Sequence, residues 1–309
     1  MIKYLKLIRY RHLLVVAFMQ LIFRFGFLKL QNIPLSLNEW QYLLLVLSTI
    51  CLVAGGAIIN AIFQQDSDIE NKPKFQVVGK FISENTAYNL YAAFTFIGVS
   101  IGFYLSNVIQ KPNFAILFIL IASTLYFHAS TMKNSLLIGN IIIALINSIY
   151  LLIIGLFDLL PATFEANRAV MGLHFSILLD YAIFTFFISL LIEIVADIEN
   201  SKGDALQGLR TLPILIGISK AKKLVFAISI IPILSVLYYL KTYIFDANLI
   251  YSSIYGLIFI VSPLIYFSSK ILISKESKEF LHLIIILKWI LLLTYLSILI
   301  ISLNIKHNA

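Results

Sequence analysis

Charged residues are scarce in this sequence. Asp, Glu, Lys and Arg make up only 12% of its 309 residues, whereas soluble globular proteins carry about 25%. Hydrophobic residues make up 61%, and 23 basic and 15 acidic side chains could not cover so much apolar surface in water. The composition therefore excludes a soluble enzyme, a secreted disulfide scaffold and a disordered chain, and it predicts a membrane protein.

The sequence also has only one cysteine and none of the common nucleotide-binding motifs. The single Cys51 lies within an apolar run, which excludes an intrachain disulfide and a cysteine-based metal site. Neither a P-loop nor a dinucleotide-binding glycine pattern is present. The net charge of +8 comes without a basic stripe of interleaved aromatic residues, so we expect no binding of nucleic acid. We also expect no cleavable signal peptide, because the first apolar run lacks a small-residue cleavage site.

Long apolar runs are what the sequence has in abundance. They are about 20 residues long and do not alternate with polar residues, which favours helices as the spanning elements. We therefore expect an all-α, polytopic membrane protein whose nine transmembrane helices form one bundle around a central chamber, as a single transmembrane domain over residues 1–309. The nine candidate spans are 9–30, 40–60, 86–108, 114–131, 136–157, 173–195, 222–240, 249–269 and 283–304.

The basic residues are distributed unequally between the two faces that nine spans define. One face carries sixteen of them, namely Lys3, Lys6, Arg9, Arg11, Lys72, Lys74, Lys80, Lys133, Lys202, Arg210, Lys220, Lys222, Lys223, Lys270, Lys275 and Lys278. The other face carries six, namely Arg24, Lys29, Lys111, Arg168, Lys241 and Lys306. Because cytoplasmic loops are enriched in Lys and Arg, we expect a multi-pass protein of the cytoplasmic membrane with a cytoplasmic N-terminus.

Two polar clusters lie on the predicted cytoplasmic face. The first follows the second span, where Asn60, Gln64 and Asp68 are spaced i, i+4, i+8 and share one face if the helix continues. The second follows the sixth span, where Asp197 and Asp204 are spaced i, i+7. Such clusters are also what ordinary solvated loops contain, but helical phasing in both of them favours a shared site.

The residue types in these clusters suit a metal ion and a phosphate. Carboxylate and amide oxygens are ligands that magnesium ions (Mg2+) prefer, and Mg2+ takes further ligands from substrate phosphates. Lys72, Lys133 and Arg210 are candidates to contact the same phosphate oxygens directly. Ionisation of an allylic diphosphate requires this combination, together with an apolar chamber that shields the carbocation from water.

The two clusters resemble the signatures of the UbiA superfamily of intramembrane prenyltransferases. Asn60, Asp68 and Asn71-Lys72-Pro73 are similar to the first signature, N-D-x-x-D-x-x-x-D followed by N-K-P. The segment from Asp197 to Pro213 resembles the second signature, especially in the branch that alkylates glycerol-phosphate lipids. Tyr126 to Lys133, followed by Gly139-Asn140, resembles the connection between the fourth and fifth helices of the family.

The resemblance implies the roles of individual residues. Asn60, Asp68, Asp197 and Asp204 would bind Mg2+, and with Gln64 they would form the catalytic set. Lys72, Tyr126, Lys133 and Arg210 would bind the diphosphate. The substrate would be an isoprenyl diphosphate of 10 to 20 carbons, and the other expected partner is the lipid bilayer that surrounds the protein. No obligate protein partner is indicated.

The first cluster departs from the family pattern. Ala61 and Gln64 stand where the family has its first two Asp residues, and Asn200 replaces a frequent Asp of the second signature. The altered first cluster resembles that of UbiA-type terpene cyclases, which ionise a prenyl diphosphate and cyclise the cation without an acceptor. We therefore favour a terpene cyclase at this point.

Two alternatives stay open. The first is a prenyltransferase that moves the isoprenyl group to a lipid of the glycerol-phosphate type or to an aromatic acceptor. The second is a non-catalytic protein or transporter, since acids within a membrane can mark an ion pathway. The transporter is disfavoured because the acids gather at one mouth with basic partners and form no relay across the bilayer.

Overall fold

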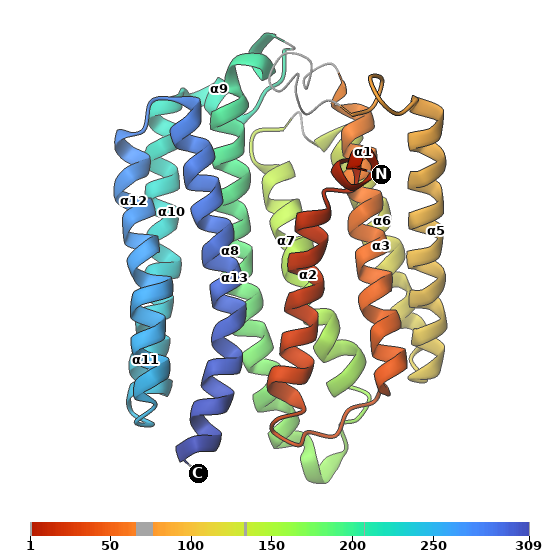
Figure 1. Cartoon of the computed structure of the whole chain (residues 1–309), viewed down its shortest axis with the longest axis vertical. Coiled ribbons are helices and arrows are strands. Elements are labelled where there is room, and N and C mark those ends of the chain that lie inside the picture. Colours follow the sequence, from red (N-terminus) through yellow and green to blue (C-terminus); the bar gives the residue numbers. More distant parts are fainter. Residues whose placement is uncertain (1, 66–76, 133–134, 207, 309) are drawn as a thin grey trace.

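The computed structural model describes residues 2–65, 77–132, 135–206 and 208–308. Within these residues, nine helical segments are long and apolar enough to cross a membrane. They stand side by side in one bundle (Figure 1). The all-α fold class and the nine predicted spans are therefore confirmed.

The helices of the bundle follow one another along the chain. They are α1 (Ile2–Leu7), α2 (Tyr10–Phe23), α3 (Glu39–Phe63), α5 (Glu84–Val108), α6 (Ala115–Ser130), α7 (Ile138–Ile154), α8 (Arg168–Leu206), α9 (Leu212–Ile216), α10 (Ile218–Tyr239), α11 (Ile250–Gly256), α12 (Ser262–Ile273) and α13 (Ser277–Asn308). Short π-helical segments lengthen several spans, namely η1 (Arg24–Leu28), η4 (Gly155–Leu159), η6 (Leu240–Phe245) and η7 (Leu257–Val261). The last of these joins α11 to α12 in one span.

Polar caps fix where the spanning helices begin. Asn38 precedes α3 and forms a capping box with Gln41, in which each side chain accepts a hydrogen bond from the backbone N–H of the other at 2.9 Å. Ser83 precedes α5 and accepts a hydrogen bond from the backbone N–H of Thr86 at 3.3 Å. These caps satisfy N–H groups that have no partner within the helix.

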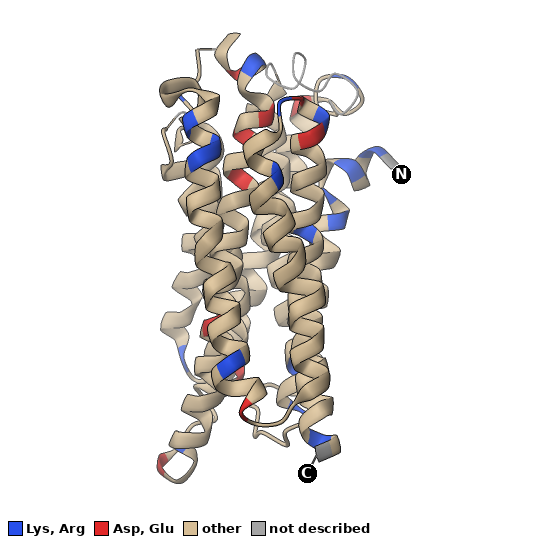
Figure 2. Ribbon diagram, turned by 90° about the vertical axis from the view of Figure 1, so that its left-hand side faces the viewer, with Lys and Arg blue, Asp and Glu red and all other residues tan. Residues whose placement is uncertain are grey.

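The bundle has two ends that differ in their contents. The last turns of α3 and α8 lie at the same end, which we call the motif end, and α1 lies near it (Figure 1). The C-terminus lies at the opposite end, which we call the distal end (Figure 1). Charged residues gather toward the two ends and leave the middle of the bundle largely uncharged (Figure 2). This distribution matches a hydrocarbon layer around the middle of the bundle.

A buried ion pair holds the distal end together. Arg24 Nη1 lies 2.7 Å from Asp158 Oδ2, and the two side chains are 2% and 0% exposed. Arg24 Nη2 also donates to the Leu37 carbonyl at 2.5 Å, and the Leu37 N–H donates to Asp158 Oδ1 at 3.0 Å. The pair therefore joins η1, at the end of the first span, to η4, which continues α7, and it fixes the connection that leads into α3.

The sixth span is longer than predicted. The sequence places it at 173–195, whereas α8 extends from Arg168 to Leu206. The difference arises because the polar residues after 195 continue as helix beyond the apolar run. This extension carries the second polar cluster on a rigid element at the motif end.

Candidate active site

Asp197 and Asp204 lie on the last turns of α8. Seven residues at 100° per residue return to nearly the same direction, so both carboxylates share one face of the helix. Asp197 is half-buried, whereas Asp204 is only 1% exposed. The predicted phasing of the second cluster is confirmed because the helix continues through both residues.

The glycine of the second cluster ends the helix at a defined point. Gly208 has φ of +70°, a conformation that glycine adopts without strain. The N–H of Leu209 donates to the Asp204 carbonyl at 3.0 Å, and the N–H of Gly208 donates to the Ala205 carbonyl at 3.1 Å. This pair of bonds forms a Schellman motif, which turns the chain directly after the acidic face. Arg210 follows in the connection to α9 and is exposed.

Asn140 is brought to Asp197 from a neighbouring helix. Its Nδ2 donates a hydrogen bond to Asp197 Oδ2 at 2.7 Å. Asn140 lies in the first turn of α7 and is 8% exposed, so the bond is shielded from water. One oxygen of the carboxylate is thereby fixed by α7, which orients the other oxygen.

Gly139 makes the approach to this point possible. A Cβ at Gly139 would lie 2.9 Å from the Met132 carbonyl oxygen and 3.3 Å from His128 Nε2. A larger residue would therefore push the start of α7 away from the end of α6. In the sequence, Gly139-Asn140 stands out only through its resemblance to the family. A polar residue within the apolar run that opens a span was the signal that could have added Asn140 to the site.

Asn200 supplies a further oxygen on the same side of α8. It follows Asp197 by three residues and precedes Asp204 by four, which places all three on one face. Its Oδ1 atom is buried and has no hydrogen-bond partner within the described part of the chain. A buried polar oxygen without a partner costs free energy, which a bound cation would recover.

The first cluster begins at the end of α3. That helix ends at Phe63, and Gln64 Nε2 donates a hydrogen bond to Asn60 Oδ1. Both side chains are half-buried. The i, i+4 relation of these two residues is confirmed, whereas Asp68 and Lys72 lie outside the described residues.

Tyr126 lies next to this cluster. It belongs to α6 and packs its ring against Phe63 of α3, with 5.9 Å between ring centroids. The ring of Tyr91 from α5 is 6.3 Å from it. Tyr126 is therefore held at the motif end by three helices, while Lys133, which follows α6, lies outside the described residues.

The motif end thus collects oxygen donors from two helix ends and an amide that orients one of them. Within the described ranges, no group of three or more His, Cys, Asp or Glu side chains is close enough to hold a metal ion. The predicted metal set of Asn60, Asp68, Asp197 and Asp204 includes one residue outside those ranges, so it stays a prediction. Oxygen donors of this kind suit a hard cation that keeps waters and takes phosphate oxygens as ligands.

Comparison with known proteins places this geometry in context. The model of the UbiA prenyltransferase family matches residues 14–301. A digeranylgeranylglyceryl phosphate synthase of Sulfurisphaera tokodaii is 28% identical over 228 residues, which are 72% of this chain and 74% of that protein.

Two solved structures share the fold over almost the whole chain. A structure described as giving insight into digeranylgeranylglyceryl phosphate synthase in membranes has a TM-score of 0.62 and 22% identity, and the match covers 97% of each chain. A UbiA homologue from Archaeoglobus fulgidus bound to GPP and Mg2+ has a TM-score of 0.59 and 17% identity, with 97% of this chain and 99% of that chain covered.

Proposed function

We propose that this chain, which belongs to the UbiA prenyltransferase family, transfers an isoprenyl group from its diphosphate to a lipid acceptor of the glycerol-phosphate type. The observation that carries the proposal is the similarity to a digeranylgeranylglyceryl phosphate synthase along about three quarters of both chains. The name of that relative describes a glyceryl phosphate that carries two geranylgeranyl groups. We accordingly infer a long-chain isoprenyl diphosphate as donor and a prenylated glyceryl phosphate as acceptor.

The comparisons favour the transferase over the cyclase that the sequence analysis preferred. The cyclase interpretation rested on Ala61 and Gln64 in the first cluster. The second cluster, which resembles the branch acting on glycerol-phosphate lipids, agrees with the named relatives instead. We therefore adopt the alternative, and Gln64 becomes a departure from the family pattern within a transferase.

Mg2+ fits the residues at the motif end. The oxygen donors there are the carboxylates of Asp197 and Asp204 and the buried Oδ1 of Asn200. When bound, Mg2+ neutralises the diphosphate and so favours breakage of the bond to the first isoprenyl carbon. The A. fulgidus homologue with GPP and Mg2+ supports the same assignment.

The side chains of this chain would position the reacting groups. Asp197, fixed by Asn140, and Asp204 would hold the metal. We expect Asn60 and Asp68 of the first cluster to supply further oxygen ligands. Arg210, Lys133, Lys72 and Tyr126 would contact the diphosphate as donors. An apolar chamber, as the sequence predicts, would exclude water during the transfer. The acceptor hydroxyl oxygen would form the new bond to the isoprenyl carbon, the diphosphate would leave, and the hydroxyl proton would be released.

The test is a product assay with purified protein. Isoprenyl diphosphates of 10, 15 and 20 carbons are incubated with Mg2+, with and without a geranylgeranylglyceryl phosphate acceptor. The proposal expects a double-chain ether lipid only when the acceptor is present and little consumption of donor without it. A cyclic hydrocarbon formed without acceptor would contradict the transferase and restore the cyclase.

Variants tie the activity to the motif end. We expect Asp197→Ala and Asp204→Ala each to abolish diphosphate release. Asp246→Ala is the matched control, because Asp246 is an exposed acid next to the distal-end segment η6. Turnover that survives both site substitutions would contradict the assignment. As a companion test, Gln64→Asp restores a family carboxylate, and a transferase should then gain activity.

A further inference from the structure

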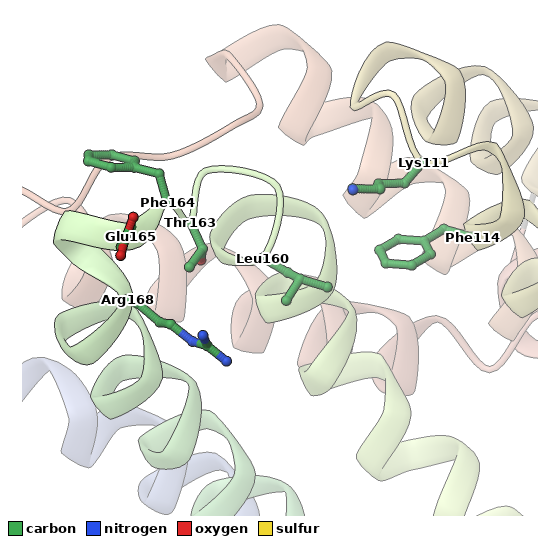
Figure 3. Close-up of a pocket in the computed structure, with 7 residues that line it drawn as sticks. All are labelled: Lys111, Phe114, Leu160, Thr163, Phe164, Glu165 and Arg168. Carbon is green, nitrogen blue, oxygen red and sulfur yellow. The ribbon is translucent and has the colours of Figure 1, made fainter.

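The distal end holds a cavity far from the residues described above. Its volume is about 640 Å³, and it opens between the connection from α5 to α6 and the connection from α7 to α8 (Figure 3). The lining residues are Lys111, Phe114, Leu160, Thr163, Phe164, Glu165 and Arg168. Asp197 and Asp204 lie at the other end of α8, so this cavity is separate from the candidate active site.

Two cations that form no ion pair within the described residues face this cavity. Lys111 and Arg168 project toward its middle from opposite sides (Figure 3). Neither side chain makes a hydrogen bond or an ion pair with the described residues, although Glu165 also lines the cavity. Two other cations at the distal end do have partners, because Arg24 is paired with Asp158 and Lys29 is paired with Glu39. Together with the carboxylate of Glu165, the two cations leave a net charge of +1 at the cavity, which favours an anionic ligand.

Three of the seven lining residues, Phe114, Leu160 and Phe164, are apolar. Leu160 and Phe164 are 46% and 60% exposed. The ring of Phe114 packs against the ring of Phe157 in η4, with 5.8 Å between the ring centroids. The cavity is therefore lined by exposed apolar side chains and by cations together. All seven residues lie at or beside the ends of spanning helices, which is the depth of lipid headgroups.

We propose that this cavity binds the headgroup of an anionic phospholipid. Lys111 and Arg168 donate hydrogen bonds to the phosphate oxygens, and the guanidinium of Arg168 suits two of them at once. Phe114, Leu160 and Phe164 contact the glycerol backbone and the first carbons of the chains. The site is a lipid site of the membrane leaflet at the distal end and takes no part in the prenyl transfer at the motif end.

The test measures lipid retention by native mass spectrometry of the detergent-solubilised protein. The probes are dioleoyl phosphatidylglycerol and dioleoyl phosphatidylcholine, which share their chains and differ in net charge. We expect one tightly retained phosphatidylglycerol and weaker retention of phosphatidylcholine. The variant Lys111→Gln with Arg168→Gln should weaken the phosphatidylglycerol complex about tenfold or more, because two charge-assisted contacts are lost.

The chain offers a matched control. Lys241 and Lys306 are exposed cations near the distal end that do not line this cavity, so Lys241→Gln with Lys306→Gln should leave retention within about twofold. The variant Lys111→Arg with Arg168→Lys keeps both charges and should keep binding, which separates a loss of charge from a loss of folding. Leu160→Ser with Phe164→Ser should weaken retention of the lipid, because two apolar contacts are lost.

Three results would overturn the proposal. The first is equal retention by the cavity variant and by the control variant. The second is equal retention of the anionic and the zwitterionic lipid by the unchanged protein. The third is displacement of the lipid by millimolar inorganic phosphate, which would assign free phosphate to the two cations and leave the apolar side chains without a role.

Discussion

Asn140 illustrates what a single polar side chain contributes to the motif end. Its 2.7 Å hydrogen bond fixes one oxygen of Asp197 from the adjacent helix. Under the proposed function Asp197 holds Mg2+, and replacing a residue that orients a metal ligand costs about 10- to 100-fold in metal affinity or activity. We therefore expect Asn140→Ala to lower the rate of prenyl transfer by that factor and to raise the Mg2+ concentration needed for half-maximal rate.

The same helix pair supplies the control for this prediction. Asn147 Nδ2 of α7 donates a hydrogen bond to Ser189 Oγ of α8 at 3.3 Å. Ser189 precedes Asp197 by about two turns of α8, so this bond does not involve the acidic residues. Asn147→Ala should leave the Mg2+ dependence unchanged. If both variants shift the Mg2+ titration equally, Asn140 acts through helix packing and not through Asp197.

Arg24 is a buried cation, and replacing it tests how much its ion pair contributes to stability. Arg24→Met would leave the Asp158 carboxylate, which is 0% exposed, without its cation. Loss of one partner of a buried ion pair costs about 3–5 kcal/mol, while replacement of both by apolar residues is often neutral. We expect a large fall of the melting temperature for Arg24→Met in detergent and recovery of most of it in Arg24→Met with Asp158→Leu.

An exposed ion pair at the same end serves as the comparison. Lys29 and Glu39 also form an ion pair, but their side chains are 38% and 69% exposed. Water screens such a pair, so Lys29→Met should change the melting temperature little. A double variant at Arg24 and Asp158 that melts as early as Arg24→Met would show that the hydrogen bonds to Leu37, and not the charges, hold this end.

At the scale of elements, close helix packing depends on particular glycines. A Cβ at Gly102 of α5 would lie 2.3 Å from a ring carbon of Phe118 on α6, and Phe118 is fully buried. Phe118 cannot move freely, since its ring packs against Phe157 at 5.4 Å. Because overpacking costs about 1–3 kcal/mol, we expect Gly102→Ala to lower the melting temperature clearly.

Gly172 is the matching glycine without such a constraint. It lies in α8, and nothing stands within 4 Å of the position of its Cβ. Alanine is the better helix former by about 1 kcal/mol in water, so Gly172→Ala should melt at the same temperature or higher. Equal destabilisation by both substitutions would contradict the packing explanation.

The elements also show where a sequence reveals the fold and where it does not. The apolar runs predict all nine spans, because the bilayer demands a continuous apolar length of helix. The apolar runs do not predict that α8 continues to Leu206. The residues after 195 are polar, and hydropathy alone does not distinguish a polar end of a helix from a polar loop. Gly208 follows the end of α8. The positive φ of this glycine turns the chain so that two backbone hydrogen bonds close the end of the helix.

The site follows the same division. The spacing of Asp197 and Asp204 is local, so the sequence predicts their common face correctly. The contact of Asn140 with Asp197 joins residues 57 positions apart in two helices, and only the packing of α7 on α8 creates it. The ion pair of Arg24 and Asp158, 134 positions apart, was missed for the same reason.

At the scale of the whole molecule, the charges predict an orientation that can be measured. The nine spans predicted from the sequence assign sixteen basic residues to the face of the motif end and six to the opposite face, so we expect the motif end in the cytoplasm. Cys51 is 4% exposed and is the chain's single cysteine. The unchanged protein should therefore resist a membrane-impermeant maleimide, and Cys51→Ser provides a background without cysteine.

Two single cysteines in that background decide the orientation. Lys278→Cys reports on the exposed start of α13 at the motif end, and Asp246→Cys reports on the exposed residue after η6 at the distal end. In intact cells Asp246→Cys should react at once, whereas Lys278→Cys should react only after the membrane is permeabilised. The opposite pattern would place the polar clusters outside the cell. An isoprenyl diphosphate supplied from the cytoplasmic side could then not reach Asp197 and Asp204, and the proposed transfer would need a donor from the other side.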